Sequence, residues 1–280
     1  MESLTNWSTL WTDLVETRAR GRQLAEGRDP QADLWADRAR EFDTHVKRRW
    51  RDPDSSRTFI RAQLTPDATV LDIGAGTGAW TALFAGQTAH VTALDPSPAM
   101  LSILRENVMG QGITNVSVIQ GAWPEVDVAP HDFSLCAHAM YGVPDFVTFV
   151  RRMVAVTTRM CFLILRAPNL NSILATAARR IWGQPYDSPN FTIAYNILLE
   201  MGIYPNVLIE TPNLRDLRFS PSLNSALSDV KRHFSLANST EHDDFLMDLL
   251  CQRLTVSDGG YVWPRDEQAA LVYWSVNGNG

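Results

Sequence analysis

The part of this sequence best suited to chemistry contains three glycines at alternate positions and two acids. Each acid follows apolar residues. Gly74, Gly76 and Gly78 directly follow the apolar run that carries Asp72, and Asp95 closes the next apolar run. Glycine permits positive φ and lets a ligand lie against the backbone. An acid at the end of the second strand is placed to accept hydrogen bonds from a ribose diol. The spacing predicts a strand, a glycine turn, a helix, a strand and an acid, which together hold a nucleotide.

Two kinds of nucleotide site share this outline. The run from Gly74 to Ala79 fits the G-x-G-x-x-G/A pattern of dinucleotide-binding folds. Asp72, however, lies two residues before the first glycine, where dinucleotide folds usually keep an apolar strand residue. An anion there is poorly placed beside a pyrophosphate and well placed for a cationic ligand. The acid favours a cationic ligand, and a nicotinamide-dependent oxidoreductase is kept as an alternative.

Both acids begin motifs that are found together in one family. The run from Asp72 to Gly78 reads acid-x-G-x-G-x-G, and the run from Asp95 to Leu101 reads as an acid, a turn and a helix ending in Met-Leu. In these motifs the segment from 68 to 166 resembles the class I S-adenosylmethionine-dependent methyltransferases. The resemblance implies S-adenosylmethionine as cofactor, S-adenosylhomocysteine as product and transfer of a methyl group as the activity.

The resemblance also assigns positions around the cofactor. It places Asp72 toward the ammonium, the three glycines beneath the middle of the molecule and Asp95 on the two ribose hydroxyls. Pro96 and Met100 would line the adenine side. Each acid has a structural alternative: Asp72 can cap backbone N–H groups of the loop, and Asp95 can cap the helix that follows it.

The turn after the third expected strand departs from the family pattern. The family often carries an acid there that bonds the adenine amino group, whereas this chain has Gly121, Ala122 and Trp123. Backbone groups of this turn can still read the adenine edge, and the indole of Trp123 can stack on the ring. The alternative for Trp123 is a side chain that plugs the sheet edge.

The fourth expected strand runs into His138 and Tyr141, near the carboxyl end where ligands bind in parallel sheets. The segment resembles the family's fourth motif, whose last residues face the methyl group. His138 could donate to the cofactor or accept a substrate proton, and Tyr141 is a second candidate acceptor. Both can instead be hydrogen-bonded parts of the fold. Asp145 is expected to cap the helix that follows it rather than act as a base.

Candidate substrate residues follow the fifth strand. Arg166 and Asn169 are expected at the edge of the same crevice, together with Tyr186 and Tyr195 from the next segments. Arg166 would suit a carboxylate or phosphate on the substrate. The alternative is an ordinary surface loop.

Apolar runs alternate with helical patterns from residue 68 onward, which is typical of a parallel sheet covered by helices on both faces. The resemblance implies an α/β fold: a Rossmann-like, doubly wound, mostly parallel seven-stranded sheet with an antiparallel last strand, Ala270–Val276. The expected strands are Thr69–Ile73, His90–Leu94, Val116–Gln120, Phe133–Ala137, Met160–Leu165 and Asn206–Glu210. The expected helices between them are Ala79–Gly86, Pro98–Gly110, Phe146–Val156 and Asn190–Met201.

The first 66 residues are expected to form a helical cap or lid segment before the main domain of residues 67–280. Apolar stripes predict helices over 1–17 and 35–50, separated by a linking turn over 18–30. These stripes can pack against the domain, which is the simpler role. They can also close over the cofactor, which is the more specific role. Insertions are expected near 167–190 and 220–254, followed by a hairpin-like pairing of 261–263 with 269–276.

The composition indicates which kinds of substrate and partner the chain can bind. The chain has 280 residues, with 25 Lys and Arg against 31 Asp and Glu, a net charge of −6 that disfavours nucleic acid as a substrate. The expected acceptor is a small molecule, and the oligomeric state is left open between a monomer and a homodimer. A binding module that kept the cofactor fold without turnover is a further alternative.

The chain shows no signal for a membrane or for secretion. No apolar run approaches the roughly 18–20 residues that span a bilayer, and no secretory signal opens the sequence. The three cysteines, Cys136, Cys161 and Cys251, fit neither a metal site nor a disulfide framework. A cytoplasmic location and the absence of a metal are therefore expected.

Overall fold

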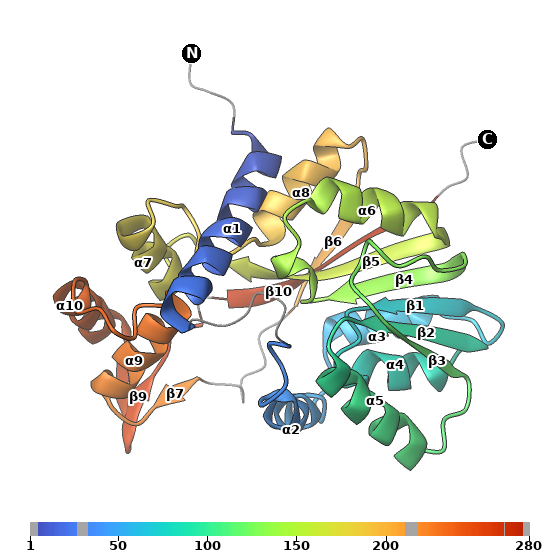
Figure 1. Cartoon of the computed structure of the whole chain (residues 1–280), viewed down its shortest axis with the longest axis horizontal. Coiled ribbons are helices and arrows are strands. Elements are labelled where there is room, and N and C mark those ends of the chain that lie inside the picture. Colours follow the sequence, from blue (N-terminus) through green and yellow to red (C-terminus); the bar gives the residue numbers. More distant parts are fainter. Residues whose placement is uncertain (1–4, 27–32, 211–217, 266, 277–280) are drawn as a thin grey trace.

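The computed structural model describes the chain except residues 1–4, 27–32, 211–217, 266 and 277–280. Its centre is a seven-stranded sheet with the strand order β3-β2-β1-β4-β5-β10-β6 (Figure 1). The strands are β1 Thr69–Ile73, β2 His90–Asp95, β3 Val116–Gln120, β4 His131–Ala137, β5 Thr157–Pro168, β6 Asn206–Ile209 and β10 Glu267–Ser275. β10 pairs antiparallel with both β5 and β6, while β1 to β5 pair in parallel, which confirms the expected fold class.

Helices cover both faces of this sheet (Figure 1). One face carries α3 (Ser55–Gln63), α4 (Ala79–Ala85) and α5 (Pro98–Gly110), and the other carries α1 (Trp7–Glu26), α6 (Phe146–Ala155) and α8 (Phe191–Glu200). Successive side chains of a strand point to opposite faces. In β5, Cys161, Leu163 and Leu165 therefore join the core beneath α1, α6 and α8, whereas Phe162 and Ile164 join the core beneath α3 and α4. This alternation accounts for the unbroken apolar run of β5.

The expected bounds of helices and strands agree best with the structure where they depend on neighbouring residues in the chain. β1, β3 and α5 have the expected bounds, and Asp145 caps α6 by accepting from the Thr148 N–H at 2.9 Å. β5 is longer than expected at both ends. Its ladder with β10 extends from Pro168 opposite Glu267 to Met160 opposite Ser275, so pairing with a distant strand keeps it extended.

The N-terminal helices differ from expectation in extent. α1 continues to Glu26, so the linking turn expected from residue 18 is wrong as far as residue 26, and residues 27–30 lie outside the described part. A helix propagates easily once its first turns are fixed by packing. α2 (Ala39–Arg49) begins later than expected, because residues 34–38 form turns in which the Arg38 N–H donates to the Trp35 carbonyl at 3.0 Å.

A second, smaller unit stands beside the sheet. We call α7 (Ile173–Ile181), α9 (Leu223–His233), α10 (Asp243–Arg253) and the strands β7 (Phe219–Ser220), β8 (Thr255–Ser257) and β9 (Gly260–Val262) the appended unit. These elements share a separate apolar core, and Figure 1 shows α9, α10, β7 and β9 grouped away from the main sheet.

The hairpin expected between 261–263 and 269–276 is wrong. β9 pairs with β7 and β8 in a three-stranded sheet, and β10 joins the main sheet. The close approach of β7 explains the glycine at 260, because a Cβ there would lie 2.4 Å from the Ser220 carbonyl oxygen. No helix in the described ranges is long and apolar enough to cross a membrane.

Candidate active site

The glycine loop lies at the carboxyl ends of β1, β2 and β4, where the strand order changes direction. Gly74, Gly76 and Gly78 have φ values of 71°, 55° and 87°, the left-handed region that glycine enters without strain. A Cβ on Gly74 would lie 2.1 Å from the Cβ of Ala139, so the turn after β4 presses directly on the loop. The Gly74 N–H also donates to the Leu94 carbonyl at 2.7 Å, which ties the loop to β2. Ligands of open α/β sheets bind at such a point.

Asp95 is fixed between the loop and α5. Its Oδ2 accepts from the Gly76 N–H at 2.8 Å, and its Oδ1 accepts from the Ser97 N–H at 2.9 Å. Ser97, not Asp95, is the residue that caps α5, because its hydroxyl accepts from the Met100 N–H. Burial raises the pKa of Asp95 above its ordinary value, against the effect of the two N–H donors. The carboxylate is thus oriented by two backbone groups that each use only one of its lone-pair positions.

Asp72 lies buried beneath the loop. Its Oδ2 accepts from the Thr81 hydroxyl at 2.6 Å, which fastens the first part of α4 to β1. Burial raises the pKa of Asp72 to about 7, and the negative charge of Asp95 adds to this effect. The two carboxylates therefore share one electronegative region.

No basic side chain neutralises this region in the described part of the chain. The ion pairs found there include neither Asp72 nor Asp95. A third acid, Asp33, lies close enough for its charge to raise the pKa of Asp95 further. Three acids without a cationic partner repel a pyrophosphate and attract a cationic ligand.

The turn after β3 packs against Asp95. The Gly121 N–H donates to the Asp95 carbonyl at 3.1 Å, and a Cβ on Gly121 would lie 2.2 Å from a Val126 methyl group. The Trp123 indole is buried and donates through Nε1 to the Phe149 carbonyl at 3.2 Å. Of the two roles considered for Trp123, this position favours packing over stacking on a ligand. The backbone of the half-buried Ala122 is what the turn leaves available to an adenine edge.

His138 ends β4 in a strained conformation. Its φ is 56°, in the left-handed region, while its N–H donates to the Ile164 carbonyl at 2.9 Å. Such strain in a residue other than glycine costs on the order of 1–3 kcal/mol and is concentrated at functional sites. Its ring Nδ1 lies 3.0 Å from the Tyr141 hydroxyl, which accepts from the Arg166 N–H at 2.7 Å. Burial, with the charges of Arg49 and Arg166, lowers the pKa of His138 to about 3, so the ring is neutral at physiological pH.

The four expected substrate residues are not all gathered at one place. The Arg166 side chain is held by Ser188 and Asp187 at 3.0 and 3.3 Å. Tyr186 is buried in the core cluster against which Tyr141 packs. Asn169 is exposed and shapes the turn before α7, and Tyr195 is half-buried on α8, with its ring 5.6 Å from that of Phe191.

Comparison with known proteins finds a family match over part of the chain. A family model described as a methyltransferase domain matches residues 70–160. These residues contain the glycine loop, Asp95 and His138, and they cover β1 to β4 and the start of β5. This match agrees, over these residues, with the resemblance to the class I S-adenosylmethionine-dependent methyltransferases.

The relatives of this chain are methyltransferases whose names give different acceptors. It is 32% identical over 120 residues to a demethylmenaquinone methyltransferase from Listeria welshimeri, which covers 41% of this chain and 48% of that one. It is 35% identical over 107 residues to a protein-L-isoaspartate O-methyltransferase from Koribacter versatilis, covering 38% and 47%. The chain thus spans about half the length of these relatives.

A solved structure shares the fold of this chain over a larger part of its length. A putative methyltransferase from Bacillus halodurans superposes with a TM-score of 0.55 at 17% identity, over 79% of this chain and 97% of that one. The common fold agrees with the seven-stranded sheet described above.

α2 covers the glycine loop of the methyltransferase domain. The position that a Cβ on Gly76 would take is 3.8 Å from the Phe42 ring. Asn107 of α5 joins the two parts, because its Nδ2 donates to Asp43 Oδ1 and to the Thr77 carbonyl, both at 2.9 Å. Burial opposes ionisation of Asp43, yet hydrogen bonds from Lys47, Asn107 and Thr77 hold its pKa below the ordinary value.

Sequence reasoning missed Asp33 and the group formed by Asp43 and Asn107. Asp33 Oδ2 accepts from the Ser97 hydroxyl at 2.9 Å and so reaches the start of α5. The only signal in the sequence was the apolar stripe of the predicted helix over 35–50, which contains Phe42. Nothing in that stripe specifies which surface it covers.

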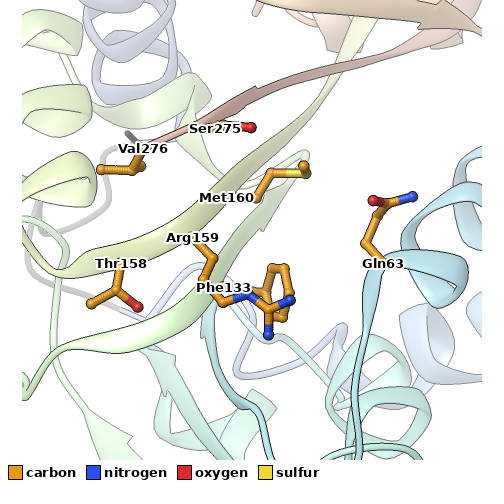
Figure 2. A pocket seen from close by; sticks show the side chains of 7 residues that line it. All are labelled: Gln63, Phe133, Thr158, Arg159, Met160, Ser275 and Val276. Carbon is orange, nitrogen blue, oxygen red and sulfur yellow. The ribbon is translucent and has the colours of Figure 1, made fainter. Parts of the chain in front are cut away.

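A shallow cavity of about 450 Å³ opens at the end of the main sheet that is opposite the candidate site. It is lined by Gln63, Phe133, Thr158, Arg159, Met160, Ser275 and Val276. Figure 2 shows the Arg159 side chain lying against Phe133, with Gln63 of α3 on the other side. The guanidinium lies 4.8 Å from the Phe133 ring centre and donates to the Thr65 hydroxyl at 3.2 Å. This cavity lies near the start of β5, whereas the candidate site lies at the carboxyl ends of the strands.

Proposed function

We propose that this chain transfers a methyl group from S-adenosylmethionine to a small-molecule acceptor. The observation that carries the proposal is the electronegative region at the glycine loop. Asp72 and Asp95 lie beside the loop without a basic partner among the described residues, which suits a cofactor with an ammonium and a sulfonium. A dinucleotide would bring a pyrophosphate into the same field, so the nicotinamide-dependent alternative is disfavoured.

The residues present fit this cofactor. An ionised carboxylate offers about four acceptor positions, and the N–H groups of Gly76 and Ser97 use two of those on Asp95. The remaining two match the two hydroxyls of a ribose. Asp72 would attract the ammonium from below the loop, directly or through water. Pro96, which is exposed, and the backbone of Gly121 and Ala122 would border the adenine.

The protein's contribution to such a reaction is mainly positional. When bound, S-adenosylmethionine supplies a methyl group on a sulfonium, and a lone pair of the acceptor forms the new bond to carbon as the carbon–sulfur electrons pass to sulfur. Holding the acceptor in line with that bond supplies most of the rate. α2 and the turn after β4 lie against the loop, and closure of the site against water would strengthen electrostatic interactions there.

His138 and Tyr141 are the proposed groups at the acceptor. A neutral ring can accept a proton from an acceptor that must lose one, or donate a hydrogen bond to it. Burial and two cationic neighbours lower the pKa of His138 to about 3, so its ring is uncharged but a weak proton acceptor, and its proposed part is a hydrogen bond to the acceptor. Arg166, Asn169, Tyr186 and Tyr195 stay proposed as substrate residues, with Arg166 best placed because it adjoins Tyr141.

A small acceptor in a cytoplasmic setting is part of the same proposal. The net charge of −6 gives little support to binding a polyanion. Cys136, Cys161 and Cys251 are free thiols, as expected for a reducing compartment. In the described part of the chain, no group of His, Cys, Asp and Glu could hold a metal ion.

The test is isothermal titration of S-adenosylhomocysteine into the wild type and two variants. Asp95→Ala should lose most of the affinity, because it removes the ribose contact and the acceptor for the Gly76 N–H. Asp132→Ala is the matched control, since Asp132 also accepts a backbone N–H, that of Thr69 at 2.9 Å, at the other end of the sheet. Equal affinities for wild type and Asp95→Ala would contradict the assignment of Asp95 to the ribose. Binding of NADH, measured by fluorescence enhancement, would favour the oxidoreductase instead.

A further inference from the structure

A continuous chain of hydrogen bonds connects the appended unit to the end of β4. It starts at His233, the last residue of α9, whose Nε2 lies 2.8 Å from Asp187 Oδ2. Asp187 Oδ2 also accepts from Arg166 Nη2 at 3.3 Å. The Arg166 N–H donates to the Tyr141 hydroxyl at 2.7 Å, and that hydroxyl lies 3.0 Å from His138 Nδ1. The chain therefore ends on the strained residue that faces the proposed acceptor.

Asp187 is the centre of this chain. Its side chain is 0% exposed, and its pKa is held well below the ordinary value, because the His233 hydrogen bond and the charges of Arg166, His233 and Arg18 outweigh the effect of burial. An ionised carboxylate only accepts, so His233 Nε2 carries the proton of their hydrogen bond. Arg18 belongs to α1, Arg166 to β5 and His233 to α9. Asp187 thereby joins three parts of the molecule.

Burial of the surrounding loop shows that this arrangement is fixed. Residues 186–190 are all buried, although they form no helix or strand, and loops usually lie on the surface. Asn190 caps α8 by accepting from the Thr192 N–H at 2.9 Å, and Ser188 accepts from Arg166 Nη1. Removing one partner of a buried carboxylate strongly destabilises the folded protein. The position of the Arg166 side chain thus depends on Asp187 and His233, whereas its backbone is held in β5 by pairing with β10.

We propose that Asp187 and His233 are positioning residues for His138. They hold the Arg166 guanidinium, whose charge reaches the His138 ring, while the Arg166 N–H in β5 sets the Tyr141 hydroxyl against that ring. The appended unit then has a role in the reaction without touching the acceptor, because its packing fixes the ring that does. This inference rests on the proposed function in taking His138 as the group that faces the acceptor.

The test reads the His138 ring directly and needs no acceptor. The full chain, labelled with 15N, is examined by NMR for the ring nitrogens of its six histidines, and His138 is assigned from the signals lost in His138→Gln. His233→Ala should move the Nδ1 signal of His138, because the Arg166 guanidinium loses its fixed position and its charge shifts relative to the ring. His233→Gln, which restores a donor near Asp187, should return the signal toward that of the wild type.

Lys231→Met is the matched control. Lys231 lies on the same helix and pairs with Asp243 of α10 at 2.7 Å, so its loss weakens the appended unit without touching Asp187. The His138 signal should stay unchanged in this variant. Arg166→Lys serves as a second variant should His233→Ala fail to fold, because it keeps a positive charge beside Asp187 but loses the planar fork. It should move the His138 signal as well.

Two results would overturn the proposal. One is an unmoved His138 signal in both His233→Ala and Arg166→Lys. The other is an equal movement in Lys231→Met, which would show a general loosening of the appended unit. S-adenosylhomocysteine titration of the same samples keeps the two proposals apart. A wild type that does not bind it contradicts the proposed function, while the NMR comparison still decides whether the hydrogen-bond chain positions the ring.

Discussion

At the scale of single residues, the site is an acidic pocket whose acids are held in different ways. Asp95 is oriented by two backbone N–H groups, and Asp72 is buried with the Thr81 hydroxyl as a partner. The pKa of Asp72 near 7 makes this residue half protonated at neutral pH in the free protein. Its ionisation is therefore linked both to folding and to the charge of a ligand.

Cofactor binding should release a proton from Asp72 near pH 7. The ammonium of S-adenosylhomocysteine favours the charged carboxylate and lowers its pKa, so affinity should rise between pH 6 and pH 8. Titration at pH 7 in buffers with different ionisation enthalpies should show the released proton. Asp72→Asn should remove this buffer dependence, and the exposed Asp67→Asn should leave it in place. A wild type without buffer dependence would contradict the linkage.

The same group should make the free protein less stable as the pH rises. The folded pKa of Asp72 lies above the ordinary value of about 3.9. The folded state therefore binds the proton more tightly, and the free energy of unfolding should fall from about pH 4 to about pH 7 and then level off for this group. Urea unfolding across this range should show a smaller fall in Asp72→Asn than in the wild type. An identical pH profile in the two proteins would refute the assignment.

Gly74 should tolerate no side chain. Both Gly74→Ala and Gly112→Ala place a Cβ at positive φ, which costs about 1–2 kcal/mol. Only the first also meets a neighbour, the Cβ of Ala139 at 2.1 Å, whereas nothing lies within 4 Å of the second. Gly74→Ala should therefore lose more stability in urea unfolding and bind S-adenosylhomocysteine at least about tenfold more weakly. Equal losses in the two variants would show that backbone strain alone matters.

At the scale of elements, the two N-terminal helices have separate attachments. α1 packs in the core shared with α6 and α8, and Trp11 donates through Nε1 to the Val143 carbonyl at 2.8 Å. α2 instead lies on α5 and the glycine loop, where Phe42 faces Gly76. The cap proposed for residues 1–66 thus has one part built into the sheet domain and one part that lies against the glycine loop.

Removal of the Asn107 side chain should loosen α2 and weaken cofactor binding. Asn107→Ala leaves the buried Asp43 and the Thr77 carbonyl without their shared donor, at a cost of about 1–3 kcal/mol. Hydrogen exchange in residues 39–49 should become faster, and the affinity for S-adenosylhomocysteine should fall. Arg40→Gln is the control, because its pair with Glu106 is exposed and contributes about 0–1 kcal/mol. Unchanged exchange in Asn107→Ala would remove this link between α2 and the loop.

At the scale of the whole molecule, two separate apolar cores are joined through one buried carboxylate. The sheet core includes α1, and the appended unit has its own apolar cluster. Asp187 joins them through Arg166 on one side and His233 on the other. The proposed acceptor residues therefore lie near the boundary between two units, as is common for ligand sites.

Trp11→Ala should destabilise the entire sheet domain. The indole is fully buried and stacks on Phe146 with ring centres 4.2 Å apart, so the loss should be about 3–5 kcal/mol. Urea unfolding measures this loss, and Tyr204→Ala, at a side chain that is 82% exposed, should change stability by less than about 0.5 kcal/mol. A small effect of Trp11→Ala would mean that α1 is not part of the core.

Part of this arrangement was predictable because it depends on neighbours in the chain. The glycines predict the positive φ values of the loop, and Asp145 predicts the cap of α6. β1, β3 and α5 have the expected bounds because their periodicity and turn residues are local. The extension of α1 to Glu26 and the pairing of β9 with β7 were not predictable, since both depend on packing between distant segments.

The sequence by itself determined the cofactor half of the site: a strand, a glycine loop and an acid at the end of the next strand, all within 26 residues from Val70 to Asp95. Only the tertiary structure decided that Trp123 packs inward, that α2 covers the loop and that Arg166 is held by Asp187 and His233. The physical reason is distance along the chain. Backbone conformation follows from adjacent residues, but a contact such as that of Asp187 with His233, 46 residues apart, is fixed only when the separate units pack.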